Sequence, residues 1–256
     1  MLLQNKTAVI TGCNRGIGKK ILEVFSANGA TIFACVRNIT EEFKAYLSEI
    51  KKKFNNQIIP IQFDLNDENQ IKEAANNVLS SNSSIDILVN NAATIHTALF
   101  QMTSIKKLKE VFETDFFSQT IFTQYILKSM IKKKDGSILY ISSSSALDGN
   151  EGRSAYSSAK AAMITQAKVL SREVGIYNIR VNAIAPGLTN TDMMRKNTPE
   201  EILNEVTSRI SLKRIASPEE IANVALLISS DLSSYITGQV IRVDGGMWWI
   251  LMKQTR

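Results

Sequence analysis

The sequence predicts an α/β protein built on a single doubly wound parallel sheet of seven strands, with helices on both faces. Three observations lead to this fold class. Short apolar segments alternate with longer amphipathic segments along the chain, which favours parallel strands joined by right-handed helical crossovers. The short segments are nearly continuous in apolar residues, as in strands covered on both faces. The first of them runs into a glycine-rich turn before a helical pattern.

The expected elements follow in chain order. The strands are residues 8–11, 31–36, 58–63, 85–90, 137–142, 179–183 and 239–243, and the helices are residues 16–28, 40–54, 67–81, 103–133, 154–176 and 217–230. The last helix has a clear start, because Ser217-Pro218-Glu219-Glu220 combines an N-cap serine, a first-turn proline and a capping-box glutamate. No linker, repeat or low-complexity segment interrupts the pattern, so we expect one domain over residues 1–256.

Composition narrows the class of protein. The chain is 44% hydrophobic and 21% charged, which suits a soluble globule. No apolar run has the length of a membrane span, and the first residues lack a signal-peptide pattern. The two cysteines, Cys13 and Cys35, have no metal-type spacing, so we expect reduced thiols, no metal and a cytoplasmic location.

The net charge of +6 permits an acidic partner without naming one. Two basic clusters, residues 51–53 and 132–134, each end a helical stretch, where cations suit the helix dipole. No basic-aromatic platform accompanies them, so nucleic-acid binding is not expected.

The glycine-rich turn after the first strand predicts a dinucleotide site. Glycines allow a tight turn and close backbone approach to a ligand, and the N-terminus of the following helix favours a pyrophosphate. Placement after the first strand of an alternating chain makes this more than a common turn. The predicted contacts here are Gly12, Cys13, Asn14, Arg15, Gly16, Ile17 and Gly18.

The end of the second strand predicts NADP(H) over NAD(H). An NAD site usually has an acidic residue there that binds the ribose 2′-hydroxyl, but this strand ends in Cys35-Val36. Arg37 follows, and Arg15 lies in the glycine-rich turn. Two guanidinium groups suit a 2′-phosphate. The alternative for Arg37 is an ordinary surface arginine.

The stretch Ser154-Ala-Tyr-Ser-Ser-Ala-Lys160 places Tyr156 and Lys160 on one helix face. Taken alone, this could be a packed tyrosine and a solvated lysine. Together with the glycine-rich turn, Asn90-Asn91-Ala92-Ala93, the serines after the fifth strand and Pro186-Gly187, the chain resembles the short-chain dehydrogenases/reductases. The resemblance covers nearly the whole chain in order and implies a Rossmann-type fold.

This resemblance implies the catalytic roles. Tyr156 would exchange a proton with the carbonyl oxygen. Lys160 would lower the pKa of Tyr156 and bind the cofactor ribose. Ser143 would be the second donor to that oxygen, with Ser142 as the alternative. Asp115 stands where the family usually has an asparagine, a departure that puts the proton relay in question. Ala93 replaces a commoner glycine.

The same resemblance assigns the other cofactor contacts. Those at the adenine are Asp64 and Leu65, those at the ribose are Asn90 and Ala92, and those at the nicotinamide and phosphates are Pro186, Gly187, Thr189 and Thr191. Asp64 could instead cap the following helix.

Residues 186–193, 217–223 and 234–247 are similar to 3-oxoacyl-acyl-carrier-protein reductases of fatty acid synthesis. The resemblance implies a small-molecule or carrier-linked substrate, for which Lys132–Lys134 could dock an acidic carrier, although Tyr177 occupies a second position that is often basic. Residues 188–212 are expected to form a substrate lid. The apolar tail, residues 247–252, is expected at an interface of a homo-oligomer, a homotetramer.

Other functions stay open. The substrate could be another small ketone, a sugar or a polyol, and the chain could be a catalytically silent dinucleotide sensor. An enoyl reductase fits less well, because that relative spaces its tyrosine and lysine more widely. A serine hydrolase is disfavoured, because the single histidine, His96, has no elbow motif with it.

Overall fold

A computed structural model describes residues 1–81 and 84–247. Its centre is a seven-stranded sheet in the order β3-β2-β1-β4-β5-β6-β7, with every neighbouring pair parallel. The predicted fold class is confirmed. The strands are β1 (Thr7–Thr11), β2 (Thr31–Val36), β3 (Ile58–Gln62), β4 (Ile87–Asn90), β5 (Gly136–Ile141), β6 (Ile179–Pro186) and β7 (Val240–Val243).

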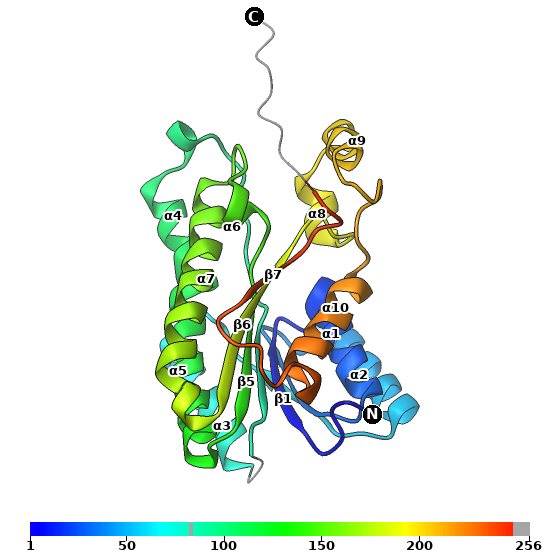
Figure 1. Ribbon diagram of the computed structural model, residues 1–256, viewed down its shortest axis with the longest axis vertical. Helices are drawn as coiled ribbons and strands as arrows, with labels where there is room; N and C mark the ends of the chain where they lie inside the picture. Colours follow the sequence, from blue (N-terminus) through cyan, green and yellow to red (C-terminus); the bar gives the residue numbers. More distant parts are fainter. Residues whose placement is uncertain (82–83, 248–256) are drawn as a thin grey trace, which may run out of the picture.

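Helices cover both faces of this sheet (Figure 1). One layer holds α1 (Gly16–Ala27), α2 (Glu41–Phe54) and α10 (Pro218–Ser229). The other holds α3 (Glu68–Ser80), α4 (Ile105–Phe112), α5 (Ser118–Lys133) and α7 (Ser154–Val174). Short helices α6 (Ser145–Asp148), α8 (Asp192–Asn197) and α9 (Glu200–Ser208) lie beyond the carboxyl ends of the strands.

The core forms two apolar clusters, one on each face of the sheet. Successive strand residues point to opposite faces, so Ile10 joins the cluster that contains Phe25 of α1. Val9 joins the other cluster, with Phe122 of α5. The predicted capping box of α10 is present, since Ser217 accepts from the Glu220 backbone and the Glu220 side chain accepts from Ser217 N.

Strand order reverses between β2 and β4, which flank β1 on either side. Chains of this topology leave a crevice at the carboxyl ends of the strands there. This reversal determines where the site lies.

Two segments differ from the expected pattern. The helix predicted over residues 103–133 is divided into α4 and α5 by a π-helical turn at Glu113–Phe117. A helical pattern does not reveal an extra residue in one turn, so this turn could not be predicted from the sequence. The stretch at residues 188–212 contains α8 and α9.

Among the described residues, no helix has both the length and the apolar character needed to cross a membrane.

Candidate active site

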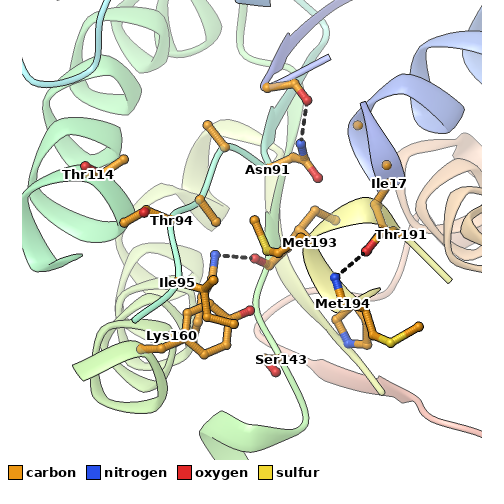
Figure 2. A pocket seen from close by; sticks show the side chains of 18 of the residues that line it. Ile17, Asn91, Thr94, Ile95, Thr114, Ser143, Lys160, Thr191, Met193 and Met194 are labelled. Carbon is orange, nitrogen blue, oxygen red and sulfur yellow. Dashed lines mark hydrogen bonds between the residues drawn. The ribbon is translucent and has the colours of Figure 1, made fainter. Parts of the chain in front are cut away.

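A cavity of about 730 Å³ opens at the carboxyl ends of the strands, beside the reversal in strand order. Figure 2 shows Thr94, Ile95 and Lys160 on one side of it, with Thr191 and Met194 across from them. The segments that line the cavity come from the glycine-rich turn, the ends of β2 to β6, the start of α7 and the lid segment. Most of the residues predicted for the site therefore meet in one place.

The glycine-rich turn has a backbone shape that other residues would strain. Gly12 has φ of +72° and Gly16 has φ of +57°. A Cβ on Gly18 would collide with the carbonyl oxygen of Gly12 and the amide of Asn91. The helix that follows has no acidic residue in its first turn and no side-chain cap, so its free N–H groups suit a phosphate.

Two arginines line the cavity next to β1 and β2, whereas Tyr156 belongs to α7, which packs against β5 and β6. Arg15 and Arg37 are exposed, both line the cavity, and neither belongs to an ion pair between described residues. Asp64 also lines the cavity, and its Oδ1 accepts hydrogen bonds from the backbone and side chain of Asn66. The cap of α3 is Asp67, so the alternative role of Asp64 as a helix cap is wrong.

Two predicted contacts have side chains that point elsewhere. The Cys13 thiol is buried and donates to the carbonyl oxygen of Ile10 (2.8 Å), and burial raises its pKa. The Asn90 amide is buried and donates to Thr123 Oγ1 (2.9 Å). Neither residue lines the cavity, so a cofactor contact by these side chains is not supported.

The neighbouring residue, Asn91, lines the cavity, whereas Asn90 does not. Its side-chain amide donates to the carbonyl oxygens of Thr11 (2.9 Å) and Gly12 (3.1 Å) (Figure 2). It thereby joins the end of β4 to the glycine-rich turn. The sequence places two asparagines in a row, and only the strand register decides which one faces the turn.

Ser143 lies on the segment after β5, which is held against β6 by the bond from Ser144 N to the carbonyl oxygen of Pro186 (2.8 Å). Ser143 lines the cavity and its Oγ lies 2.9 Å from Ser145 Oγ. Ser142 also borders the cavity, but its buried hydroxyl donates to the backbone oxygen of Lys160 (2.9 Å). The geometry therefore favours Ser143 over Ser142 as the donor to a substrate.

Tyr156 and Lys160 start α7 and both line the cavity. Lys160 is buried and its Nζ donates to the carbonyl oxygen of Ile141 (3.0 Å). The ammonium lies 5.8 Å from the centre of the Tyr156 ring. Burial lowers the pKa of Lys160. Burial, followed by the charge of Asp115, raises the pKa of Tyr156 to about 12, while Ser143 and Arg153 act in the opposite direction.

Asp115 is held behind the cavity by the π-helical turn. Its Oδ1 accepts from the backbone N–H of Thr94 (2.7 Å), and its Oδ2 lies 3.7 Å from Lys160 Nζ. The side chain is fully buried and Oδ2 has no hydrogen-bond partner among the described residues. Burial raises the pKa of this carboxyl to about 6, against the lowering effects of Lys160 and Thr94. Asp115 thus touches Lys160 rather than the cavity.

The remaining predicted contacts lie along the opposite wall. Pro186, Gly187 and Thr189 line the cavity after β6. Thr191 caps α8 by accepting from Met194 N (3.2 Å), and a Cβ on Gly16 would lie 3.3 Å from its methyl group. The start of the lid segment therefore contacts the glycine-rich turn directly.

Comparison with known proteins assigns the family. A family model described as enoyl-(acyl carrier protein) reductase matches residues 12–248. The 3-oxoacyl-[acyl-carrier-protein] reductase of Chlamydia trachomatis is 39% identical, over 96% of this chain and 98% of the relative. The chain belongs to the short-chain dehydrogenases/reductases. It is accordingly an oxidoreductase acting on CH–OH and C=O groups, with a nicotinamide dinucleotide as cofactor.

Other short-chain dehydrogenases/reductases are also similar along the whole chain. A 3-oxoacyl-[acyl-carrier-protein] reductase of Aquifex aeolicus is 39% identical, over 96% of this chain and 98% of the relative. A 3alpha-hydroxysteroid dehydrogenase of Mediterraneibacter gnavus is 33% identical over the same shares. A solved structure of a putative gluconate dehydrogenase from Agrobacterium tumefaciens has a TM-score of 0.91 and 28% identity, covering 97% of this chain and 98% of that one.

The predicted carrier-docking cluster lies away from the cavity. Lys132–Lys134 precede β5, whereas the cavity lies beyond the end of that strand. Lys133 is also paired with Asp86 and Asp135. A carrier bound at Lys132–Lys134 would thus be at the other end of the sheet from the cavity of the same subunit.

Proposed function

We propose that the chain catalyses NADPH-dependent reduction of the 3-oxo group of a 3-oxoacyl thioester, linked to acyl carrier protein or to coenzyme A. The observation that supports this most strongly is the convergence of Ser143, Tyr156 and Lys160 at one end of a dinucleotide-sized cavity. The similarity to 3-oxoacyl-[acyl-carrier-protein] reductases at up to 39% identity favours this substrate class.

Ser143, Tyr156 and Lys160 would each have a separate role in the reduction of the carbonyl group. The bound cofactor would supply the hydride that reduces the carbonyl carbon. Ser143 would donate a hydrogen bond to the carbonyl oxygen, and Tyr156 would give that oxygen a proton. Lys160, fixed by Ile141 on the same side as Tyr156, would stabilise the phenolate that remains. The second face of the carbonyl would be covered by Met193 and Met194 of α8, which line the cavity.

NADPH is favoured over NADH by the charge at the adenosine end. Arg15 and Arg37 border the cavity there, and the strand that precedes Arg37 ends in Val36 instead of a carboxylate. A guanidinium pair suits a 2′-phosphate. We expect Arg37→Gln to raise the KM for NADPH about tenfold or more, with little change for NADH, since one charged hydrogen-bond partner is lost. Initial rates with both cofactors provide the check.

The proposed function is tested by following NADPH absorbance with acetoacetyl-coenzyme A and purified protein. NADPH consumption that falls about a hundredfold or more in Tyr156→Phe supports the reductase, because general acid catalysis contributes at least that much. NADPH binding without turnover of the thioester would refute this substrate class. A panel of other ketones, sugars and polyols would then follow, and failure across the panel would favour the silent sensor.

A second substrate class, a small ketone or sugar with an acidic group, is favoured by one specific observation. Arg153 lines the cavity three residues before Tyr156. A 3-oxoacyl group has no charge for this guanidinium to pair with near the reacting carbonyl.

A further inference from the structure

Arg153 lines the cavity but has no role in the reaction proposed for Ser143, Tyr156 and Lys160. We call "substrate end" the part lined by Ser143, Asn150, Arg153, Tyr156 and His96. Arg153 is the N-cap residue of α7, and its charge lowers the pKa of Tyr156, although burial of the phenol has the larger, opposite effect. Arg153 therefore lies at the same helix start as Tyr156, and both line the cavity, whereas Arg15 and Arg37 line it next to β1 and β2.

The guanidinium of Arg153 is only partly satisfied. Nη2 donates to the backbone carbonyl oxygen of Asn197 at the end of α8 (3.0 Å). Nη1 is buried without a hydrogen-bond partner among the described residues, and Arg153 is in none of the ion pairs found there. A buried charged donor without an acceptor is costly. Burial accordingly lowers the pKa of Arg153.

Three carboxylates line the cavity, Asp64, Glu110 and Asp192, and none of them forms an ion pair with Arg153 among the described residues. Glu110 lines the cavity but is already paired with Lys107. His96 also lines the substrate end, and its Nε2 is buried without a partner among residues 1–81 and 84–247. The loop that holds His96 is tied to the one before α7 by the bond from Ala98 N to the carbonyl oxygen of Gly152 (3.0 Å). Two buried nitrogen atoms without partners among the described residues, Arg153 Nη1 and His96 Nε2, therefore belong to segments that are hydrogen-bonded to each other.

We propose that Arg153 binds an oxyanion, a carboxylate or a phosphate, carried by the ketone that Tyr156 protonates. The chain would then prefer acidic ketones to neutral ketones of the same carbon skeleton. Guanidinium groups pair with both oxyanions through parallel hydrogen bonds, and the pairing is strengthened where water is excluded. The proposal rests on the proposed carbonyl reductase chemistry and specifies its second substrate class, because the anion and the carbonyl would belong to one molecule in the same site.

The test compares two matched pairs of ketones by calorimetric titration of the protein, free and saturated with NADP⁺. Acetoacetate against methyl acetoacetate reports on a carboxylate, and dihydroxyacetone phosphate against dihydroxyacetone reports on a phosphate. Wild-type protein should bind the anionic member of at least one pair about tenfold or more tightly, as expected for a charged hydrogen-bonded pair. In Arg153→Gln the difference within that pair should disappear, and in Arg153→Lys it should return in part.

Arg195→Gln is the matched control. Arg195 is a cation of α8, the helix whose Asn197 accepts from Arg153, but Arg195 donates to Asn190 Oδ1 (2.9 Å) and does not line the cavity, so the preference for the anion should persist. The proposal is overturned if wild-type protein shows no such preference in either pair, or if Arg153→Gln retains it. Because binding is measured without turnover, this result is independent of whether acetoacetyl-coenzyme A is reduced in the assay of the proposed function.

Discussion

At the scale of single residues, the site depends on which side chains face the cavity. Tyr156, Lys160 and the glycines of the turn after β1 meet there. Asn90 and Asn91 are adjacent and chemically identical, so only the register of β4 separates the buried one from the one that faces the turn. The contact of Arg153 with Asn197 depends on where α8 lies, which no local pattern encodes.

Asp115 leads to a prediction about pH. Oxidation of an alcohol needs the Tyr156 phenolate, so its rate rises with pH through the pKa of Tyr156. The ionised Asp115 carboxylate contributes to raising that pKa. Asp115→Asn removes the negative charge, so the rising part of the profile should shift to lower pH, by about one unit. The measurement is the pH dependence of kcat/KM for oxidation of 3-hydroxybutyryl-coenzyme A.

The charge of Asp115 itself depends on pH, so the difference between wild-type protein and Asp115→Asn should also depend on pH. The pKa of Asp115 is about 6, so wild-type protein loses the charge as the pH falls below that value. The two proteins should therefore agree near pH 5 and diverge above pH 7. Glu113→Gln is the control, since it removes an exposed carboxylate from the same π-helical turn and should leave the profile in place. An unshifted profile in Asp115→Asn would show that Lys160 screens the carboxylate from Tyr156.

At the scale of elements, helix and strand positions follow from hydrophobic period and caps, whereas breaks inside a helix do not. The alternation of apolar segments predicted every strand, and the capping box marked α10. The π-helical turn at Glu113–Phe117 lies between α4 and α5, in a stretch with no proline or glycine to mark a break. It has a tertiary contact, since Asp115 in this turn accepts from Thr94 N (2.7 Å) on another segment.

The turn between β1 and α1 yields a stability prediction. Gly18→Ala would force a Cβ against the carbonyl oxygen of Gly12 and the amide of Asn91. Overpacking of this kind costs about 1–3 kcal/mol, and we expect that loss in the free energy of unfolding by urea, together with weaker NADPH binding. In the control, Gly175→Ala, the new methyl group meets nothing within 4 Å at a helical φ of −58°. That protein should be as stable as wild type or slightly more stable; equal losses in both variants would refute the argument.

The lid segment, residues 188–212, yields a second prediction at this scale. Thr191 contacts the glycine-rich turn, and Met193 and Met194 line the cavity. A cofactor bound between these surfaces should hold the segment closed. NADPH should therefore slow tryptic cleavage after Arg195 and Lys196, compared with cleavage after the exposed Lys51–Lys53 of α2. Mass spectrometry of timed digests gives the rates, and equal rates with and without NADPH would contradict a lid.

At the scale of the whole molecule, the sequence predicts the sheet but not which surfaces are covered by other chains. The tail expected at an interface is residues 247–252, of which residues 248–252 lie outside the described residues. Met247, at its start, is buried against Val206 and Ile210. A different surface now offers the stronger argument for association, because large apolar side chains near α4 are exposed: Phe100 by 78%, Met102 by 71%, Ile105 by 67% and Phe117 by 49%.

These four side chains lie within residues 100–117, around α4 at one side of the molecule (Figure 1). Monomeric proteins rarely expose apolar patches of this kind, which usually mark contacts with other chains. These side chains therefore favour association, and the homotetramer expected from the sequence should have about four times the 28.4 kDa mass of the chain in light scattering. Ile105→Lys should give a smaller species, because a lysine cannot be buried there without a partner charge. Ile176→Lys changes an equally apolar residue that is 85% exposed beyond α7, and it should leave the mass unchanged. A monomeric wild-type protein, or dissociation by Ile176→Lys alone, would place the interface elsewhere or remove it.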